Sequence, residues 1–245
     1  MRRSLFSVFI LVLACSRIEA ACFDPATLAH STVSIARDFN EEESKAQPGV
    51  IGIRGTAWFL SARLIVTAAH VAEAMHLSAQ EWKDVEIRDG ESKRSVAVRV
   101  RHLAGPQVEK IAVLELRSAV PDAVVLQRRA GSLVPEEGVV SLAYPKSQLR
   151  FAGGRFVQYA DDAKLAGSAL LEMYDGDDRL VLDHGASGAP VLDCNGRVVA
   201  VVMILLTRTI SFLSNVIRVS TAWNSPNVVA IPIDVLKDFL GPSEF

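Results

Sequence analysis

Short segments rich in β-branched residues follow one another closely from residue 50 onward, and this pattern limits the folds open to the chain. Between residues 95 and 101 valine alternates with arginine and alanine, which is the period of a half-buried strand. Together with the segment before it, this strand predicts a hairpin around Asp89 and Gly90. The other predicted strands cover residues 50–54, 57–60, 64–67, 85–88, 111–116, 139–143 and 198–206.

Helical periodicity is confined to the C-terminal end. Pro232 suits the first turn of a helix, and the residues after it place Val235, Leu236, Phe239 and Leu240 on one apolar face. Many short strands with one terminal helix predict an all-β barrel or sandwich rather than βαβ units.

Length and charge narrow the classes of function. The 245 residues suit one domain of two barrels, and an apolar fraction of 50% supplies a core. The net charge is −2 and no basic stripe carries interleaved aromatic residues, so nucleic acid is not expected as a partner. The sequence has no HExxH and no paired CxxC motif, and we expect neither a metal nor a cofactor.

The N-terminus has the parts of a signal peptide. Arg2 and Arg3 precede an apolar run over residues 5–15, and small residues stand at Ala20 and Ala21. We predict a signal peptide over residues 1–20, hence an exported chain, periplasmic or secreted. The run is too short for an ordinary bilayer span, so no integral membrane span is expected in the mature chain.

Three further expectations concern this region. A lipoprotein signal with Cys15 as the lipidated residue is the alternative to simple cleavage. Residues 21–47 are polar and acidic, and we predict an arm outside the core. Cleavage near Ala20 would leave two cysteines, Cys22 and Cys194, which suggest one disulfide in an oxidising compartment; two separate thiols are the alternative.

Two segments can carry chemistry. His70 follows a predicted strand within Thr-Ala-Ala-His, and its imidazole can take up and return a proton near neutral pH. Ser187 lies in Gly-Ala-Ser-Gly-Ala-Pro over residues 185–190, a turn that can aim two backbone N–H groups at an oxyanion. Taken alone, each segment also fits a plainer interpretation: a structural histidine, and a glycine-rich loop between strands.

The order of histidine, acid and serine along the chain differs between hydrolase folds, and it distinguishes them here. All five histidines precede Ser187, whereas an α/β-hydrolase has its histidine after the serine. The subtilisin order needs an aspartate before His70, and Asp38 lies in the polar arm. The order of histidine, acid and serine, as in chymotrypsin, remains.

Five ordered motifs make the chain resemble a known family. They are GTAWF at residues 55–59, TAAHV at 67–71, AYP at 143–145, GASGAP at 185–190 and AIPID at 230–234. On these motifs the chain resembles the chymotrypsin-like serine proteases, and within them the bacterial HtrA-like trypsin-type peptidases, here without a PDZ module. The resemblance implies a chymotrypsin-like double β-barrel with a short C-terminal helix over residues 48–245, acting on protein or peptide substrates.

The same resemblance implies roles for single residues. His70 would act as general base and then general acid, and Ser187 would form an acyl-enzyme. The N–H groups of Gly185 and Ser187 would form the oxyanion hole. Val181 falls near the position of the family's primary specificity pocket.

The chain departs from the family at the third member of the triad. The family places an aspartate directly before an Ile-Ala-Val-Leu-like strand, and here Lys110 precedes that strand. A lysine cannot accept the imidazole N–H. Glu109 stands one residue earlier and needs a bulge or loop to face the same side. Three interpretations stay open: Glu109 substitutes, His70 and Ser187 act as a dyad, or catalysis is weak or absent.

We therefore expect an exported serine endopeptidase that works through an acyl-enzyme. The alternative is a catalytically impaired protease homologue that binds peptides or a partner through the same cleft, which Lys110 suggests.

Overall fold

The computed structural model describes residues 25–46, 48–90, 92–105, 110–129, 131–161, 165–175, 182, 184–205, 208–212, 215–219 and 226–240. The predicted signal peptide over residues 1–20 lies outside these ranges, as do Cys15 and Cys22.

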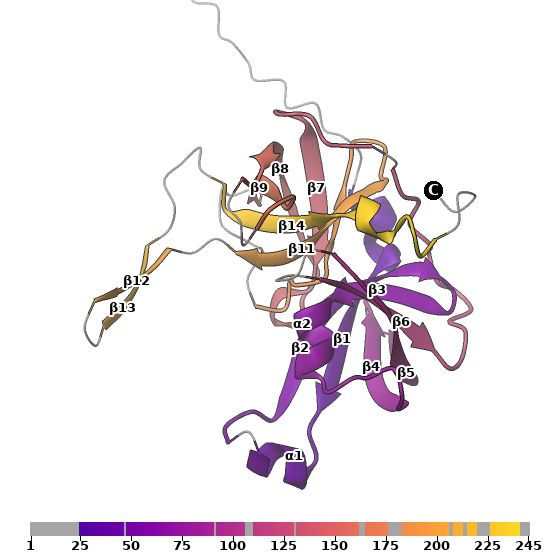
Figure 1. Ribbon diagram of the computed structural model, residues 1–245. Helices are drawn as coiled ribbons and strands as arrows, with labels where there is room; N and C mark the ends of the chain where they lie inside the picture. Colours follow the sequence, from indigo (N-terminus) through magenta and orange to yellow (C-terminus); the bar gives the residue numbers. More distant parts are fainter. Residues whose placement is uncertain are drawn as a thin grey trace, which may run out of the picture.

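Two closed antiparallel barrels make up the molecule, each with six strands (Figure 1). The first barrel has the order β1-β2-β3-β6-β5-β4 and the second the order β10-β11-β14-β9-β8-β7. The prediction of an all-β double barrel is confirmed. The strands of the first barrel are β1 (Thr32–Asp38), β2 (Gly52–Ser61), β3 (Leu64–Ala68), β4 (Lys83–Asp89), β5 (Ser92–Ala104) and β6 (Ile111–Leu116). Those of the second are β7 (Gly138–Ala143), β8 (Arg150–Tyr159), β9 (Ala169–Tyr174), β10 (Pro190–Leu192), β11 (Val198–Leu205) and β14 (Val228–Pro232).

The remaining elements are small. A two-stranded hairpin of β12 (Arg208–Phe212) and β13 (Asn215–Val219) stands away from the second barrel (Figure 1). The helices are α1 (Glu41–Ala46), α2 (Ala69–Ala74) and the 3-10 turns η1 (Pro25–Ser31), η2 (Pro145–Ser147) and η3 (Ile233–Leu236). No helix in the described ranges is long and apolar enough to cross a membrane.

The sequence patterns of β5 and β2 account for their places in the first barrel. In β5 the alternation of valine with polar residues places Val96 and Val98 in the first core, as predicted. A register shift between Val100 and His102 bends the strand. The two predicted strands over residues 50–54 and 57–60 form a single strand, β2.

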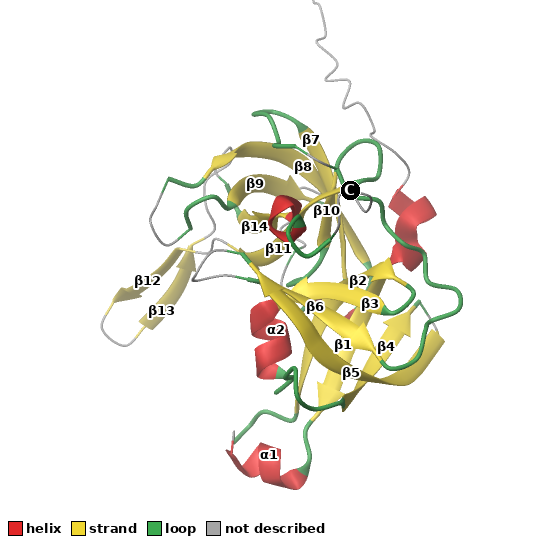
Figure 2. Cartoon of the chain, turned by 45° about the vertical axis from the view of Figure 1, so that its right-hand side comes forward, coloured by secondary structure: helices red, strands yellow, loops and turns green. Residues whose placement is uncertain are grey.

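The prediction of a polar arm over residues 21–47 is wrong for its central part. Residues 32–38 form β1, which pairs with both β2 and β4 and so closes the first barrel. Val33 and Ile35 are fully buried. Of the described residues in this stretch, those of α1 stand clear of the core, at the end of the first barrel that is remote from the second (Figure 2).

The predicted C-terminal helix is reduced to a single 3-10 turn. This turn, η3, covers residues 233–236, begins after Pro232 and gives way to turns over residues 237–239. The predicted apolar face is nevertheless used, since Leu236 and Leu240 are buried.

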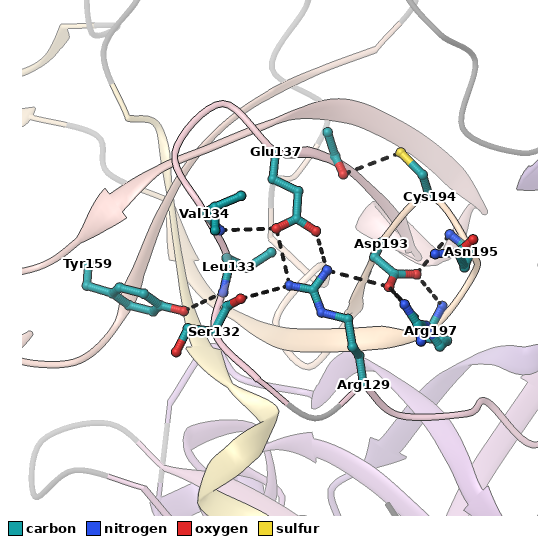
Figure 3. Close-up of polar contacts among 11 residues, drawn as sticks. Arg129, Ser132, Leu133, Val134, Glu137, Tyr159, Asp193, Cys194, Asn195 and Arg197 are labelled. Atoms are coloured by element: carbon teal, nitrogen blue, oxygen red, sulfur yellow. Dashed lines mark hydrogen bonds and ion pairs between the residues drawn. The ribbon is translucent and has the colours of Figure 1, made fainter.

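The connection between the barrels is held by an ion-pair network centred on Arg129 (Figure 3). Its guanidinium donates hydrogen bonds to both carboxylate oxygens of Glu137, just before β7, and lies 3.5 Å from Asp193 after β10. Asp193 is 2% exposed and also accepts hydrogen bonds from Arg197. Burial alone would raise the pKa of Asp193, but the hydrogen bonds from Arg197 and from the Asn195 N–H outweigh it and lower that pKa.

Candidate active site

His70 is the second residue of α2, directly after β3, where the two barrels meet (Figures 1 and 2). The N–H of Ala69 donates a 2.8 Å hydrogen bond to the carbonyl oxygen of Lys110, so the start of α2 lies against the start of β6. Gly55 lets this helix approach β2, because a Cβ atom on Gly55 would lie 2.6 Å from Val71 Cγ1. His70 itself is half-buried.

Ser187 lies in the loop between β9 and β10, and two glycines shape that loop. Gly185 has a φ of +98° and Gly188 a φ of +91°, a region that side chains other than glycine rarely adopt. A Cβ atom on Gly188 would lie 2.1 Å from the Thr56 carbonyl oxygen and 2.3 Å from Thr67 Oγ1. The serine loop of the second barrel is thus packed against β2 and against the end of β3 that leads into His70.

The Ser187 hydroxyl is half-buried and donates a 2.9 Å hydrogen bond to the carbonyl oxygen of Met203 in β11. A carbonyl oxygen cannot remove the hydroxyl proton. Nucleophilic attack therefore requires the side chain to turn from Met203 to a base, which rotation about χ1 permits.

Two backbone N–H groups beside Ser187 have no acceptor among the described residues. In the described part of the chain, neither the N–H of Gly185 nor that of Ser187 donates a hydrogen bond. The adjoining carbonyl groups are engaged: Lys146 N–H donates to His184 O at 3.2 Å, and Thr56 N–H donates to Ser187 O at 3.0 Å. Two free N–H groups on a fixed backbone are what an oxyanion hole requires.

The loop that supplies the Lys146 N–H is itself strained. Lys146 and Ser147 have φ values of +52° and +62°, which are uncommon for residues with a side chain. The turn is closed by hydrogen bonds from Ser147 N–H to Tyr144 O and from Gln148 N–H to Pro145 O. Burial raises the pKa of Tyr144, whose hydroxyl accepts a hydrogen bond from the Gly90 N–H.

Several predicted site residues lie outside the described ranges. Glu109 and Val181 are among them, so their roles as triad acid and pocket residue stay predictions. Lys110 is described and half-buried, and its carbonyl oxygen faces the start of α2. No cluster of three or more histidine, cysteine or acidic side chains suited to a metal occurs within the described ranges.

Cys194 is disulfide-bonded and lies in the turn between β10 and β11. Its Sγ is 3.6 Å from the carbonyl oxygen of Gly138 (Figure 3). Its partner is not among the described residues, so the pairing with Cys22 stays a prediction.

Sequence reasoning missed two contributors to the site. Thr56 stands inside the GTAWF motif, yet nothing in the sequence assigned it a role; only the structure shows that its hydroxyl is buried. The Met203 carbonyl left no signal, because backbone groups do not depend on residue type.

The chain matches one known protein family, and its structure is similar to solved structures. The family described as trypsin-like peptidase domain matches residues 55–201, which include His70 and Ser187. No curated protein matches the sequence. The structure is similar to the active form of Rv3671c protease from M. tuberculosis, with a TM-score of 0.59 at 18% identity over 96% of this chain and 91% of that one. It is also similar to the inactive form of that protease, with a TM-score of 0.55 at 18% identity over 86% of this chain and 88% of that one.

Proposed function

We propose that this chain, which belongs to the trypsin-like peptidase domain family, is an exported serine endopeptidase that cleaves peptide bonds through an acyl-enzyme. The observation that carries the proposal is the contact of Gly188 with Thr56 and Thr67. It brings the serine loop of one barrel to the strand of the other barrel that leads into His70. The signal-peptide pattern over residues 1–20 supports export.

The proposed reaction uses groups at this contact. His70 removes the proton from Ser187 Oγ as that oxygen attacks the substrate carbonyl carbon. The N–H groups of Gly185 and Ser187 stabilise the negative charge on the carbonyl oxygen. When the C–N bond breaks, His70 returns the proton to the leaving amine. Water then attacks the acyl-enzyme by the same route and releases Ser187.

A catalytically impaired homologue is the second candidate. Two observations favour it: Lys110 stands where the family has its triad aspartate, and the Ser187 hydroxyl is engaged by Met203 O. Such a protein would bind peptides or a partner in the same cleft without turnover.

A fluorophosphonate probe distinguishes the two candidates. Ser187 Oγ would bond to phosphorus, fluoride would leave, and the serine proton would pass to His70. The mature protein should be labelled, and Ser187→Ala and His70→Ala should not be. Ser141→Ala is the matched serine control, because Ser141 is buried in β7 and its hydroxyl bonds to the Pro190 carbonyl at 2.8 Å. Folded protein that stays unlabelled from pH 6 to 9 would exclude a ready-made enzyme and favour the binding protein.

A further inference from the structure

We infer that Thr56 is a positioning residue, whose hydroxyl fixes the direction of the N–H groups that form the oxyanion hole. The inference rests on the proposed function and adds a component from the first barrel to the site. Thr56 is fully buried in β2 and reaches the serine loop of the second barrel through both its backbone and its side chain.

In each peptide of this loop, the direction of the N–H bond is fixed by the direction of the carbonyl of the preceding residue. All described peptide bonds are trans, and in a trans peptide the C=O and N–H bonds point in opposite directions. The Gly185 N–H therefore points away from the His184 carbonyl, which is held by Lys146 N–H. The Ser187 N–H points away from the Ala186 carbonyl, which accepts a 3.0 Å hydrogen bond from Ala189 N–H.

The peptide between Gly185 and Ala186 joins these two planes, and the Thr56 side chain holds it. Thr56 Oγ1 donates a 2.6 Å hydrogen bond to the Gly185 carbonyl oxygen. Rotation of this middle peptide would change the torsions on both of its sides and so turn the two N–H groups away from a common point. Gly185 has no side chain to oppose such a rotation, and its positive φ is open to few other residues.

The direction of the Thr56 hydroxyl is itself determined. Its oxygen accepts a 2.9 Å hydrogen bond from the Tyr144 N–H, and a hydroxyl has a single proton to donate. That proton is therefore directed to the Gly185 carbonyl. The Thr56 carbonyl accepts a 2.7 Å hydrogen bond from Thr67 Oγ1, and this bond ties the residue to β3.

The test compares variants of Thr56 that lack or keep its hydroxyl and leave the rest of β2 unchanged. Thr56→Val keeps the shape of the side chain and removes the hydroxyl, whereas Thr56→Ser keeps the hydroxyl and removes a methyl group. Ser141→Ala is the control for the loss of a buried hydroxyl-to-carbonyl bond near the serine loop. For each folded variant, the maximal rate of fluorophosphonate labelling and the probe concentration that gives half of that rate are measured across pH 6 to 9.

Thr56→Val should lower the maximal labelling rate by about 10- to 100-fold, because removal of one oxyanion donor costs about 10²- to 10³-fold and misalignment costs less. The half-saturating probe concentration and the midpoint of the pH profile should stay unchanged, since neither probe binding nor His70 is altered. Thr56→Ser should restore the rate to within a few-fold of wild type.

Three results would overturn the inference: equal rates for Thr56→Val and wild type, an equal fall for Ser141→Ala, or no rescue by serine. Should Thr56→Val not fold, Thr56→Ala, which also lacks the hydroxyl, takes its place. Wild-type protein that is not labelled would instead overturn the proposed function, and with it this inference.

Discussion

Gly188 and Thr56 lie so close together that a Cβ atom on the glycine would overlap the threonine carbonyl oxygen, at 2.1 Å. The contact joins the loop that carries Ser187 to the strand next to β3 and His70, and it has no room for a methyl group. Two effects oppose a side chain here, the overlap and the φ of +91°.

The first prediction separates these effects. Gly188→Ala should lower the free energy of unfolding by about 3 kcal/mol, the sum of overpacking and a left-handed non-glycine backbone, and should abolish probe labelling. Gly167→Ala is the matched control, because Gly167 has a φ of +81° and a Cβ atom added to it would meet no atom within 4 Å. It should lose about 1 kcal/mol and keep labelling. Urea unfolding measures both variants, and equal losses would show that the contact does not matter.

The second prediction concerns the triad acid. Glu109→Gln should lower the labelling rate at least tenfold and up to about 10⁴-fold, because a neutral amide cannot stabilise the imidazolium of His70. Glu115→Gln should leave the rate unchanged, since Glu115 pairs with Arg99 on the outside of the first barrel at 2.8 Å. An unchanged rate in Glu109→Gln would favour the dyad and remove Glu109 from the proposed mechanism.

The third prediction concerns the Arg129 network. Arg129→Met should lower the free energy of unfolding by about 3 kcal/mol, because the carboxylates of Glu137 and Asp193 lose a cation while little exposed. Arg54→Met is the control: its partner Asp38 is 70% exposed, and such pairs are worth about 0–1 kcal/mol. Urea unfolding should separate the two variants, and similar losses would contradict a role for the network in holding the connection between the barrels.

The fourth prediction is a pH dependence of stability. Hydrogen bonds from Arg37 lower the pKa of Glu43 from 4.5 to about 2, with a further contribution from the Asn40 N–H and against the effect of burial. A carboxyl group whose pKa is lower in the folded state stabilises the fold above its unfolded pKa, and this contribution is lost as the pH falls from about 4.5 to 2.

Melting curves of the wild type and Glu43→Gln provide the measurement. The melting temperature of Glu43→Gln should be well below that of the wild type at pH 6, and the gap should narrow as the pH approaches 2. Glu41→Gln, on the same helix and exposed, should follow the wild type at every pH. A gap that stays constant with pH would mean that the Glu43 carboxylate contributes nothing through its charge.

The fold could be predicted where one strand carries its own pattern. Valine alternation in β5 and the apolar run in β11 identify strands without help from the rest of the chain. β1 escaped prediction because its alternating apolar residues, Val33 and Ile35, are only two and stand within a stretch whose overall composition is polar and acidic. Thr32 and Ser34 are buried as well, and their burial depends on segments distant in sequence.

Those residues of the candidate site that are identified by residue type and by their order in the chain could be predicted. The order of a histidine after a strand and a serine between glycines predicted that these two segments come together, and the structure packs the Ser187 loop against β2 and the end of β3. The role of Thr56 could not be predicted, because it depends on the approach of a loop 129 residues further along the chain. The network of Arg129 likewise depends on three segments that meet only in the folded state.

The first and the last described segments each pack against the barrel that lies further from them in sequence. Leu28 of η1, which precedes the first barrel, lies against Gly196 of the second. The ring of Phe239, which follows the second barrel, stacks at 4.5 Å on His102 of the first. Neither half can thus complete its packing before the whole chain is available, and a long-range topology of this kind makes folding slow and cooperative. A chain cut short before Phe239 would then leave His102 of the first barrel without its stacked ring, so that the two barrels reach their full packing only when the last residues have been added.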